Sequence, residues 1–202
     1  MGHYFGVRKM QNIRNFQLVT PSSEMLVGYQ NQEGKIPLFL QSEAGQDWYE
    51  CQRLFDNNTV KIMYGPDGVI HSVVDAPIPA RGNIYAVSMF WPVGMSVAEI
   101  AIDDYPTNCS IDGTWKFDGE HVYQDTIIVD ANTLAKNTTL RDKYALSATL
   151  AISAIQCSAD VGNSRDNDAD NLLLLQQYID QLRDADLTVT PAAPPITLSN
   201  LS

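Results

Sequence analysis

The sequence lacks any run of apolar residues long enough to cross a bilayer, for which about 18 in succession are needed. Its first residues, MGHYFGVRK, also lack the apolar segment of a secretory signal peptide. We therefore expect a soluble protein that is made in the cytoplasm and has no membrane contact. The hydrophobic fraction of 45% over 202 residues is sufficient for a sizeable buried core.

Basic residues are scarce. The chain has 13 lysines and arginines against 24 aspartates and glutamates, which gives a net charge of −11. A surface this acidic repels phosphate backbones, and no basic stripe offsets the repulsion. The composition therefore predicts that nucleic acid is not a partner.

The sequence also lacks the motifs of common catalytic centres. The three cysteines are widely spaced, without a C-x-x-C pair, which predicts reduced thiols and no disulfide framework. The three histidines are isolated, and no nucleophile motif, phosphate-binding glycine loop or H-E-x-x-H sequence occurs. We therefore expect no enzyme activity, no catalytic residues and no cofactor. A small hydrolase is a further alternative, and it would require two carboxylates that pair in a cleft.

A short acidic segment imitates a calcium-binding loop. Residues 166–170 (DNDAD) copy its first carboxylates, but Asn171 stands where glycine is needed and Gln177 where a bidentate glutamate is needed. The sequence therefore predicts no metal site, and predicts instead that Asp168 caps a helix, with Asp170 in its first turn.

Residues 17–124 carry the signals of strands and turns. The β-branched runs 60–64 and 69–74 flank the turn sequence Gly65-Pro66-Asp67-Gly68. In the same way, Asp118-Gly119 separates residues 115–117 from residues 121–123. Both patterns predict β-hairpins, so the N-terminal region is expected to be antiparallel and β-rich.

From about Thr133 the apolar residues follow a helical period instead. One stripe ends at Ile155, and after a break around Gly162 a second stripe continues from Leu172 to Leu182. Two such helices should pair, and should pack on the β region or on a second copy of the chain. The predicted fold class is α+β, with β-rich residues 1–124, a helical hairpin at 125–186 and an extended proline-containing tail at 187–202.

Apolar side chains in two places are candidates for binding a partner. In Met89-Phe90-Trp91-Pro92, three bulky residues in a row cannot all face one core, and exposed tryptophan and methionine are favoured interface residues. The alternative is that strand curvature near Pro92 buries all of them. The same question concerns the four apolar residues near the N-terminus, Tyr4, Phe5, Phe16 and Leu18.

Four segments carry a resemblance to a known family. They are FLQSEAGQDWYECQ at 39–52, GMSVAEI at 94–100, DGTWKFDGEHV at 112–122 and LRDADLTVTPAAPP at 182–195. Together with the helical C-terminal third, they resemble the tail fibre assembly proteins of tailed phages and of prophages of enteric bacteria. The resemblance extends from about residue 37 to the end, and its motifs are structural and not catalytic.

The resemblance implies a chaperone without ATPase activity. In such proteins an N-terminal variable domain grips the C-terminal tip of a trimeric tail fibre, and the C-terminal region helps to bring the fibre chains together. The implied partner is the C-terminal region of a tail fibre protein, with self-association as a further partner. The implied location is the host bacterial cytoplasm, although some relatives stay on the finished fibre. The alternative function is a fibre-tip adhesin that remains on the virion and contacts the host surface.

Overall fold

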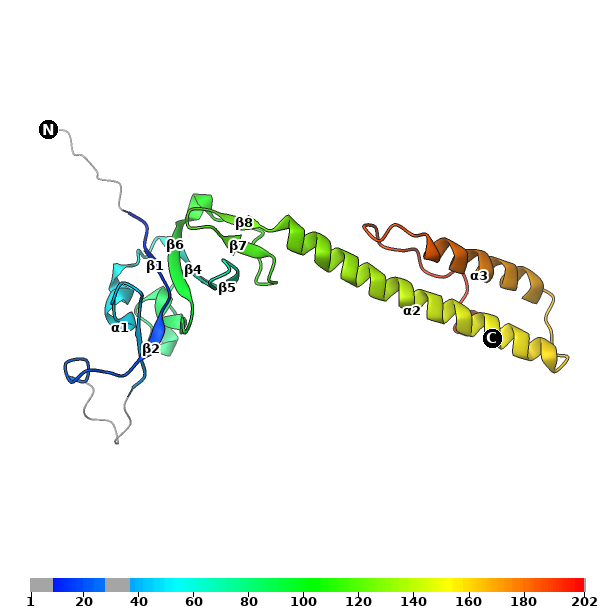
Figure 1. Ribbon diagram of the computed structural model, residues 1–202, viewed down its shortest axis with the longest axis horizontal. Coiled ribbons are helices and arrows are strands. Elements are labelled where there is room, and N and C mark those ends of the chain that lie inside the picture. Colours follow the sequence, from blue (N-terminus) through cyan, green and yellow to red (C-terminus); the bar gives the residue numbers. More distant parts are fainter. Residues whose placement is uncertain (1–8, 28–36, 202) are drawn as a thin grey trace. The chain divides into compact units, whose positions relative to one another are not determined.

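The computed structural model describes residues 9–27 and 37–201, which form two compact units (Figure 1). The first unit lies within residues 1–125 and contains every described strand, and the second lies within residues 126–202 and is helical. All the strand pairs are antiparallel. The predicted α+β fold class, with antiparallel strands followed by helices, is therefore confirmed.

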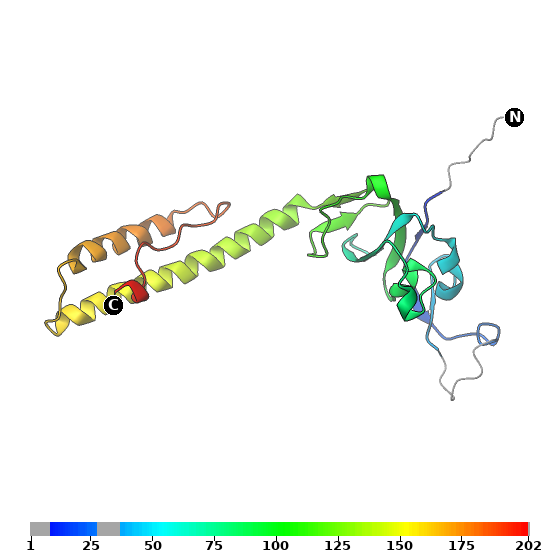
Figure 2. The same ribbon diagram turned by 180° about the vertical axis from the view of Figure 1, so that it is seen from behind.

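A four-stranded sheet forms the centre of the first unit, with the strand order β1-β6-β4-β5 (labelled in Figure 1 and seen from behind in Figure 2). The two central strands are six residues long and mostly buried, whereas the outer strands are shorter or partly exposed. The bounds of these strands are Asn12–Ile13 for β1, Thr59–Tyr64 for β4, Ile70–Val74 for β5 and Ser96–Ala101 for β6.

The first predicted hairpin is confirmed as β4 and β5. The N–H of Gly65 donates to the carbonyl of Val69 over 2.9 Å, and the N–H of Gly68 donates to the carbonyl of Gly65 over the same distance. Gly68 has a φ of +82°, a conformation that side chains disfavour and that glycine adopts readily. The turn sequence recognised from Pro66 and Asp67 thus has the expected physical basis.

The second predicted hairpin is confirmed as β7 (Trp115–Phe117) and β8 (Val122–Gln124). The carboxylate of Asp118 accepts hydrogen bonds from the backbone N–H groups of Glu120 and His121, at 2.8 and 2.7 Å, and so fixes the turn. The N–H of Phe117 donates to the carbonyl of Gly68 over 2.9 Å. This bond attaches the second hairpin to the turn of the first.

The two faces of the sheet support separate hydrophobic clusters, because neighbouring residues of a strand point to opposite faces. On one face, Val97 packs with residues from α1 (Trp48–Cys51) and from the loop after β5. The same cluster includes Phe16, which precedes β2 (Gln17–Val19), and Leu40 of its partner strand β3 (Phe39–Gln41). On the other face, Ile62 and Ala98 pack with Trp115 and Phe117 of the second hairpin. Both clusters are needed to bury the central strands.

Short helices complete the first unit. Helix α1 begins after Asp47, whose side chain accepts a hydrogen bond from the N–H of Glu50. Four 3₁₀ helices lie in the connections: η1 (Gln52–Leu54), η2 (Pro79–Arg81), η3 (Ala86–Met89) and η4 (Ile102–Asp104).

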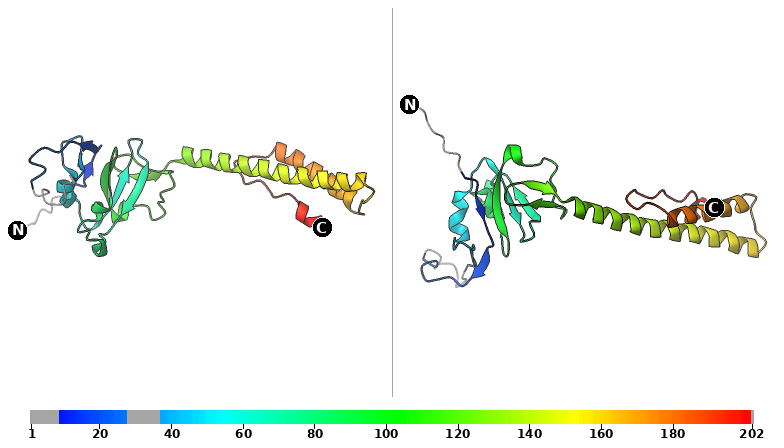
Figure 3. Two further views of the ribbon diagram at one scale, coloured as in Figure 1. Left: turned by 90° about the horizontal axis from the view of Figure 1, so that it is seen from below. Right: turned by 45° about the horizontal axis from the view of Figure 1, so that its top comes forward.

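The second unit is a pair of helices, α2 (Thr126–Asp160) and α3 (Asp168–Arg183), seen from two further directions in Figure 3. The predicted stripes form most of its core: Ala148, Ala151 and Ile155 of α2 pack with Leu175 and Leu182 of α3. Tyr178, which was not part of the predicted stripe, is also buried there, whereas Ile179 is only partly buried. Helix α2 begins at Thr126 and not near Thr133, where the helical period was expected to start. The sequence did not indicate the earlier start, because residues 126–132 contain a β-branched run without a clear helical period. No helix in the described part of the chain is both long and apolar enough to span a membrane.

The predicted cap of α3 needs a correction. Asp168 is the first residue inside the helix, and the capping position belongs to Asn167, whose side chain makes no capping hydrogen bond. The carboxylate of Asp168 instead accepts a hydrogen bond from the N–H of Arg165 over 2.8 Å. The buried acid therefore holds the turn before the helix.

The C-terminal tail lies against the helices. The hydroxyl of Tyr178 donates to the carbonyl of Ala192 over 2.6 Å, and the side chain of Asn137 donates to the carbonyl of Leu187 over 2.9 Å. Ile196 and Leu201 pack against the helical core, and the tail ends with η5 (Leu198–Asn200). The tail is thus part of the helical unit.

Candidate partner-binding surface

The segment that follows β5 places neighbouring apolar residues in opposite environments. Helix η3 ends at Met89, and the chain then continues in an extended conformation at Phe90. Phe90 is 4% exposed and belongs to the core, whereas Trp91 is 41% exposed and Pro92 is fully buried. The extended backbone therefore turns the indole of Trp91 outward between two buried residues.

The indole of Trp91 lies next to a second aromatic ring. The centroids of Trp91 and Tyr49 are 6.4 Å apart, and Tyr49 packs edge-on against Phe39 with a centroid distance of 5.8 Å. The hydroxyl of Tyr49 donates to the carbonyl of Leu38 over 3.0 Å, and the side chain of Leu38 is 61% exposed. These contacts fix Leu38, Tyr49 and Trp91 as one group, which we call the aromatic patch.

Two more exposed apolar residues are connected to the aromatic patch through the backbone. The N–H of Val93 donates to the carbonyl of Trp91 over 3.0 Å. Leu18 lies in β2, and β2 pairs with β3, which begins at the residue that follows Leu38. Both side chains are exposed. Exposed aromatic and aliphatic side chains held in a fixed arrangement are typical of surfaces that bind other proteins.

The structure separates the residues proposed from the sequence into three groups. Leu18 and Trp91 are exposed, and Met89 is half-buried with its sulfur 2.7 Å from the side-chain nitrogen of Asn83. Phe16 and Phe90 are core residues, so they present no surface to a partner; Phe16 is fully buried and packs edge-on against Trp48 at 5.1 Å. Tyr4 and Phe5 lie outside the described residues.

Sequence reasoning missed Tyr49 and Leu38 as members of this surface. Trp48 and Tyr49 are adjacent aromatic residues, and their order in the sequence does not show which of them faces the core. In the structure they belong to α1, where consecutive side chains point about 100° apart, so Trp48 is buried and Tyr49 is turned outward. The acidic residue Asp47 before the pair is the sign of a helix start that could have revealed this.

Acidic side chains lie beside the aromatic patch. A hollow of about 280 Å³ is lined by Phe39 together with the carboxylates of Glu24, Asp47 and Glu50. Phe39 is also the ring on which Tyr49 packs. The apolar surface thus has an acidic neighbourhood, which favours partners with basic side chains.

Cys51, at the end of α1, is a buried free cysteine. Burial, and secondarily the charge of Asp47, raise the pKa of the Cys51 thiol to about 12, so the reactive thiolate is scarce near neutral pH. Within the described residues, no three histidine, cysteine, aspartate or glutamate side chains converge as a metal site would require.

The first unit is therefore a β-rich fold that carries exposed aromatic and aliphatic side chains of the kind found on surfaces that bind other proteins. The sequence model of one family, described as Caudovirales tail fibre assembly protein, lambda gpK, matches residues 50–197. The chain belongs to this family, and it therefore takes part in tail fibre assembly and interacts with a tail fibre protein. No curated protein sequence matches the chain. The match begins at Glu50, after β1, β2 and β3, and includes Trp91.

Proposed function

We propose that this protein is a tail fibre chaperone that binds the C-terminal tip of a trimeric tail fibre and promotes its correct folding and trimerisation. The observation that carries the proposal is the contact between Tyr49 and Trp91, which holds an exposed indole in place on the family fold. A fixed aromatic side chain binds with little loss of conformational entropy, because its ring is already ordered before the partner arrives.

A trimeric fibre has a physical need for such a partner. Intertwined, repetitive β-chains can pair out of register, and long-range β-pairing is slow and exposes apolar edges to aggregation. A surface that holds the tip of the fibre would align the chains at one end before pairing spreads. This role needs binding and release and no chemical step, so we propose that the protein is not an enzyme and that it acts in the host cytoplasm, where fibre chains are made.

Co-expression with the tail fibre tests the proposal. The C-terminal region of the fibre, expressed alone, is expected to be largely insoluble, and co-expression with this protein should give a soluble trimer. Trp91→Ala should reduce the soluble yield, whereas Ile111→Ala, which removes a residue that is 63% exposed and lies outside the aromatic patch, should not. Equal yields of native trimer with and without the protein would exclude a chaperone function.

The composition of purified virions separates this function from the adhesin alternative. A protein that acts only as a chaperone is absent from virions that infect normally. An adhesin must be present on the fibre tip, and its removal must abolish attachment to the host.

A further inference from the structure

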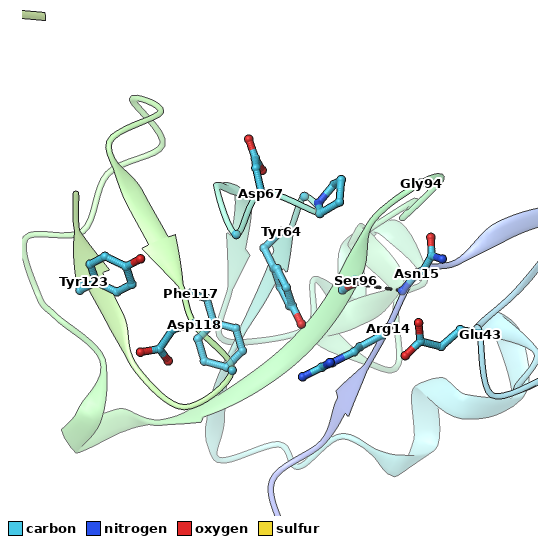
Figure 4. A pocket seen from close by; sticks show the side chains of 14 residues that line it. Arg14, Asn15, Glu43, Tyr64, Asp67, Gly94, Ser96, Phe117, Asp118 and Tyr123 are labelled. Atoms are coloured by element: carbon cyan, nitrogen blue, oxygen red, sulfur yellow. Dashed lines mark hydrogen bonds between the residues drawn. The ribbon is translucent and has the colours of Figure 1, made fainter. Parts of the chain in front are cut away.

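A groove of about 510 Å³ lies on the β-rich unit and is lined mainly by polar and charged groups (Figure 4). Its floor contains two buried aromatic rings, Tyr64 and Phe117, which pack edge-on at a centroid distance of 5.2 Å. The hydroxyl of Tyr64 donates to the side chain of Asn12 over 2.6 Å, which fixes the ring. The floor is therefore rigid, and a ligand would not have to order it.

The walls of the groove carry three carboxylates, those of Glu43, Asp67 and Asp118 (Figure 4). One oxygen of Asp67 accepts a hydrogen bond from the N–H of Val69 over 3.1 Å, and one oxygen of Asp118 accepts the two turn hydrogen bonds described above. The second oxygen of Asp67 accepts no hydrogen bond from the described residues, and the second oxygen of Asp118 lies 3.9 Å from Nδ1 of the exposed His121, too far for a hydrogen bond. The turns thus hold both carboxylates in place and leave one acceptor on each for a ligand.

One cation shares the groove with these carboxylates. The guanidinium of Arg14 points into the groove, and it makes no ion pair or hydrogen bond with the described part of the chain (Figure 4). Its backbone is held firmly, since the carbonyl of Arg14 accepts from the N–H of Glu43 over 3.1 Å. With three carboxylates and one guanidinium, the groove carries an excess of negative charge. The guanidinium also supplies N–H donors that can bind a carbonyl oxygen.

Residues that line the groove adjoin, in the sequence, exposed residues beside the aromatic patch. Val93 flanks the patch and is followed directly by Gly94, which lines the groove. On the other side, Leu18 lies four residues after Arg14, and the N–H of Asn15 donates to Ser96 in the groove over 3.0 Å. One partner chain can therefore contact both surfaces.

We propose that this groove binds an extended peptide segment with a basic side chain, the carboxylates of Asp67 and Asp118 receiving the cation and Arg14 a backbone carbonyl. The exposed ring of Tyr123 lies at the same groove and offers its face to the cation. We assign this segment to the tail fibre protein, and this assignment rests on the proposed function.

The test uses the full-length protein labelled with ¹⁵N and three capped pentapeptides, with arginine, glutamate or alanine between flanking alanines. The arginine peptide should shift the backbone amide signals of Gly68, Gly94 and Gly119 in a saturable way, and the other two peptides should not. Binding should weaken as the salt concentration rises from about 0.05 M to about 0.5 M, because the charges are exposed. Preferential binding of the glutamate peptide, or equal binding of the alanine peptide, would overturn the proposal.

Two matched double variants identify the groups that act. Asp67→Asn with Asp118→Asn keeps an acceptor oxygen for each turn and removes both charges, so the arginine peptide should bind about fivefold more weakly or worse. Asp103→Asn with Asp130→Asn makes the same change in net charge at exposed sites outside the groove and should leave the affinity unchanged. If the first variant keeps its melting temperature and binds the arginine peptide with unchanged affinity, the groove is not the binding site for the basic side chain.

The fibre experiment keeps the two proposals apart. If wild-type protein fails to solubilise the fibre while the arginine peptide still binds, the chaperone function is wrong and the groove stands. If wild-type protein solubilises the fibre and the peptide does not bind, the groove is wrong and the chaperone function stands.

Discussion

Gln11 and Glu99 bond to each other in both directions across 88 residues of sequence. The N–H of Gln11 donates to the carboxylate of Glu99 over 2.8 Å, and the N–H of Glu99 donates to the carbonyl of Gln11 over 2.9 Å. The other carboxylate oxygen accepts from the N–H of Asp56 over 2.7 Å and from the hydroxyl of Thr59 over 3.1 Å. One buried side chain thus joins the N-terminal segment to two central strands of the sheet.

We expect Glu99→Gln to destabilise the β-rich unit by about 3 kcal/mol. An amide has one acceptor oxygen in place of two, so its NH₂ group would face donors. Lys61, the cross-strand partner of Glu99, is also buried; burial lowers its pKa, and the charge of Glu99 opposes that change. Urea unfolding measures the loss, with the exposed Glu120→Gln as control, and equal stability of both variants would contradict this role.

The buried charge of Glu99 also shows what the sequence did not reveal. The two hairpins were predictable because their turns need glycine and aspartate at fixed positions, and the helices because their apolar stripes repeat locally. The pairing of β1 with β6 depends on residues more than 80 positions apart, and no local pattern marks the partner of a two-residue strand. From the sequence, a glutamate in an otherwise apolar strand does not indicate which three groups will donate hydrogen bonds to its carboxylate.

The raised pKa of the Cys51 thiol predicts that the protein loses stability at alkaline pH. The thiol pKa is 9.0 under ordinary conditions and is raised to about 12 in the folded protein, chiefly by burial. Between these values the folded chain retains a proton that the unfolded chain has lost, so the free energy of unfolding falls as the pH rises. This contribution is present in full below the ordinary pKa and is lost as the pH approaches the raised one.

The comparison of wild type with Cys51→Ala isolates this effect, because the remaining titrating groups are common to both proteins. We expect the wild type to lose more of its unfolding free energy than the variant between pH about 8 and about 10, by urea titration. Parallel losses in the two proteins would show that Cys51 does not titrate as proposed.

Gly68→Ala and Gly82→Ala form a matched pair of substitutions. Both glycines have a positive φ, +82° and +75°, so alanine costs about 1 kcal/mol of backbone strain at either position. At Gly68 a Cβ atom would also lie 2.9 Å from the carbonyl oxygen of Phe117, whereas at Gly82 it would meet nothing within 4 Å. Gly68→Ala should therefore lower the melting temperature clearly more than Gly82→Ala, and equal effects would exclude the close contact between the hairpins.

The partner-binding surface was only partly predictable. The crowding of Met89, Phe90 and Trp91 indicated that one of them must leave the core, but not which one, since the choice depends on where η3 ends. Leu38 and Tyr49 become surface residues through the position of α1 next to β3. Such relations require the packed fold, because neighbouring aromatic residues in a sequence do not reveal the direction of their side chains.

The neighbours Phe90 and Trp91 should respond in opposite ways to the same substitution. Phe90→Ala removes a ring that is 4% exposed in the core and should destabilise the free protein by about 3–5 kcal/mol. Trp91→Ala removes an exposed indole that packs on Tyr49, so it should cost only about 1 kcal/mol in the free protein but about 2 kcal/mol or more in affinity for the fibre. Thermal melts of both variants, together with fibre binding measured below the melting temperature of each, check the contrast. A Trp91→Ala protein that melts far below the wild type and still binds the fibre at full strength would place the indole in the core and remove the basis of the proposed surface.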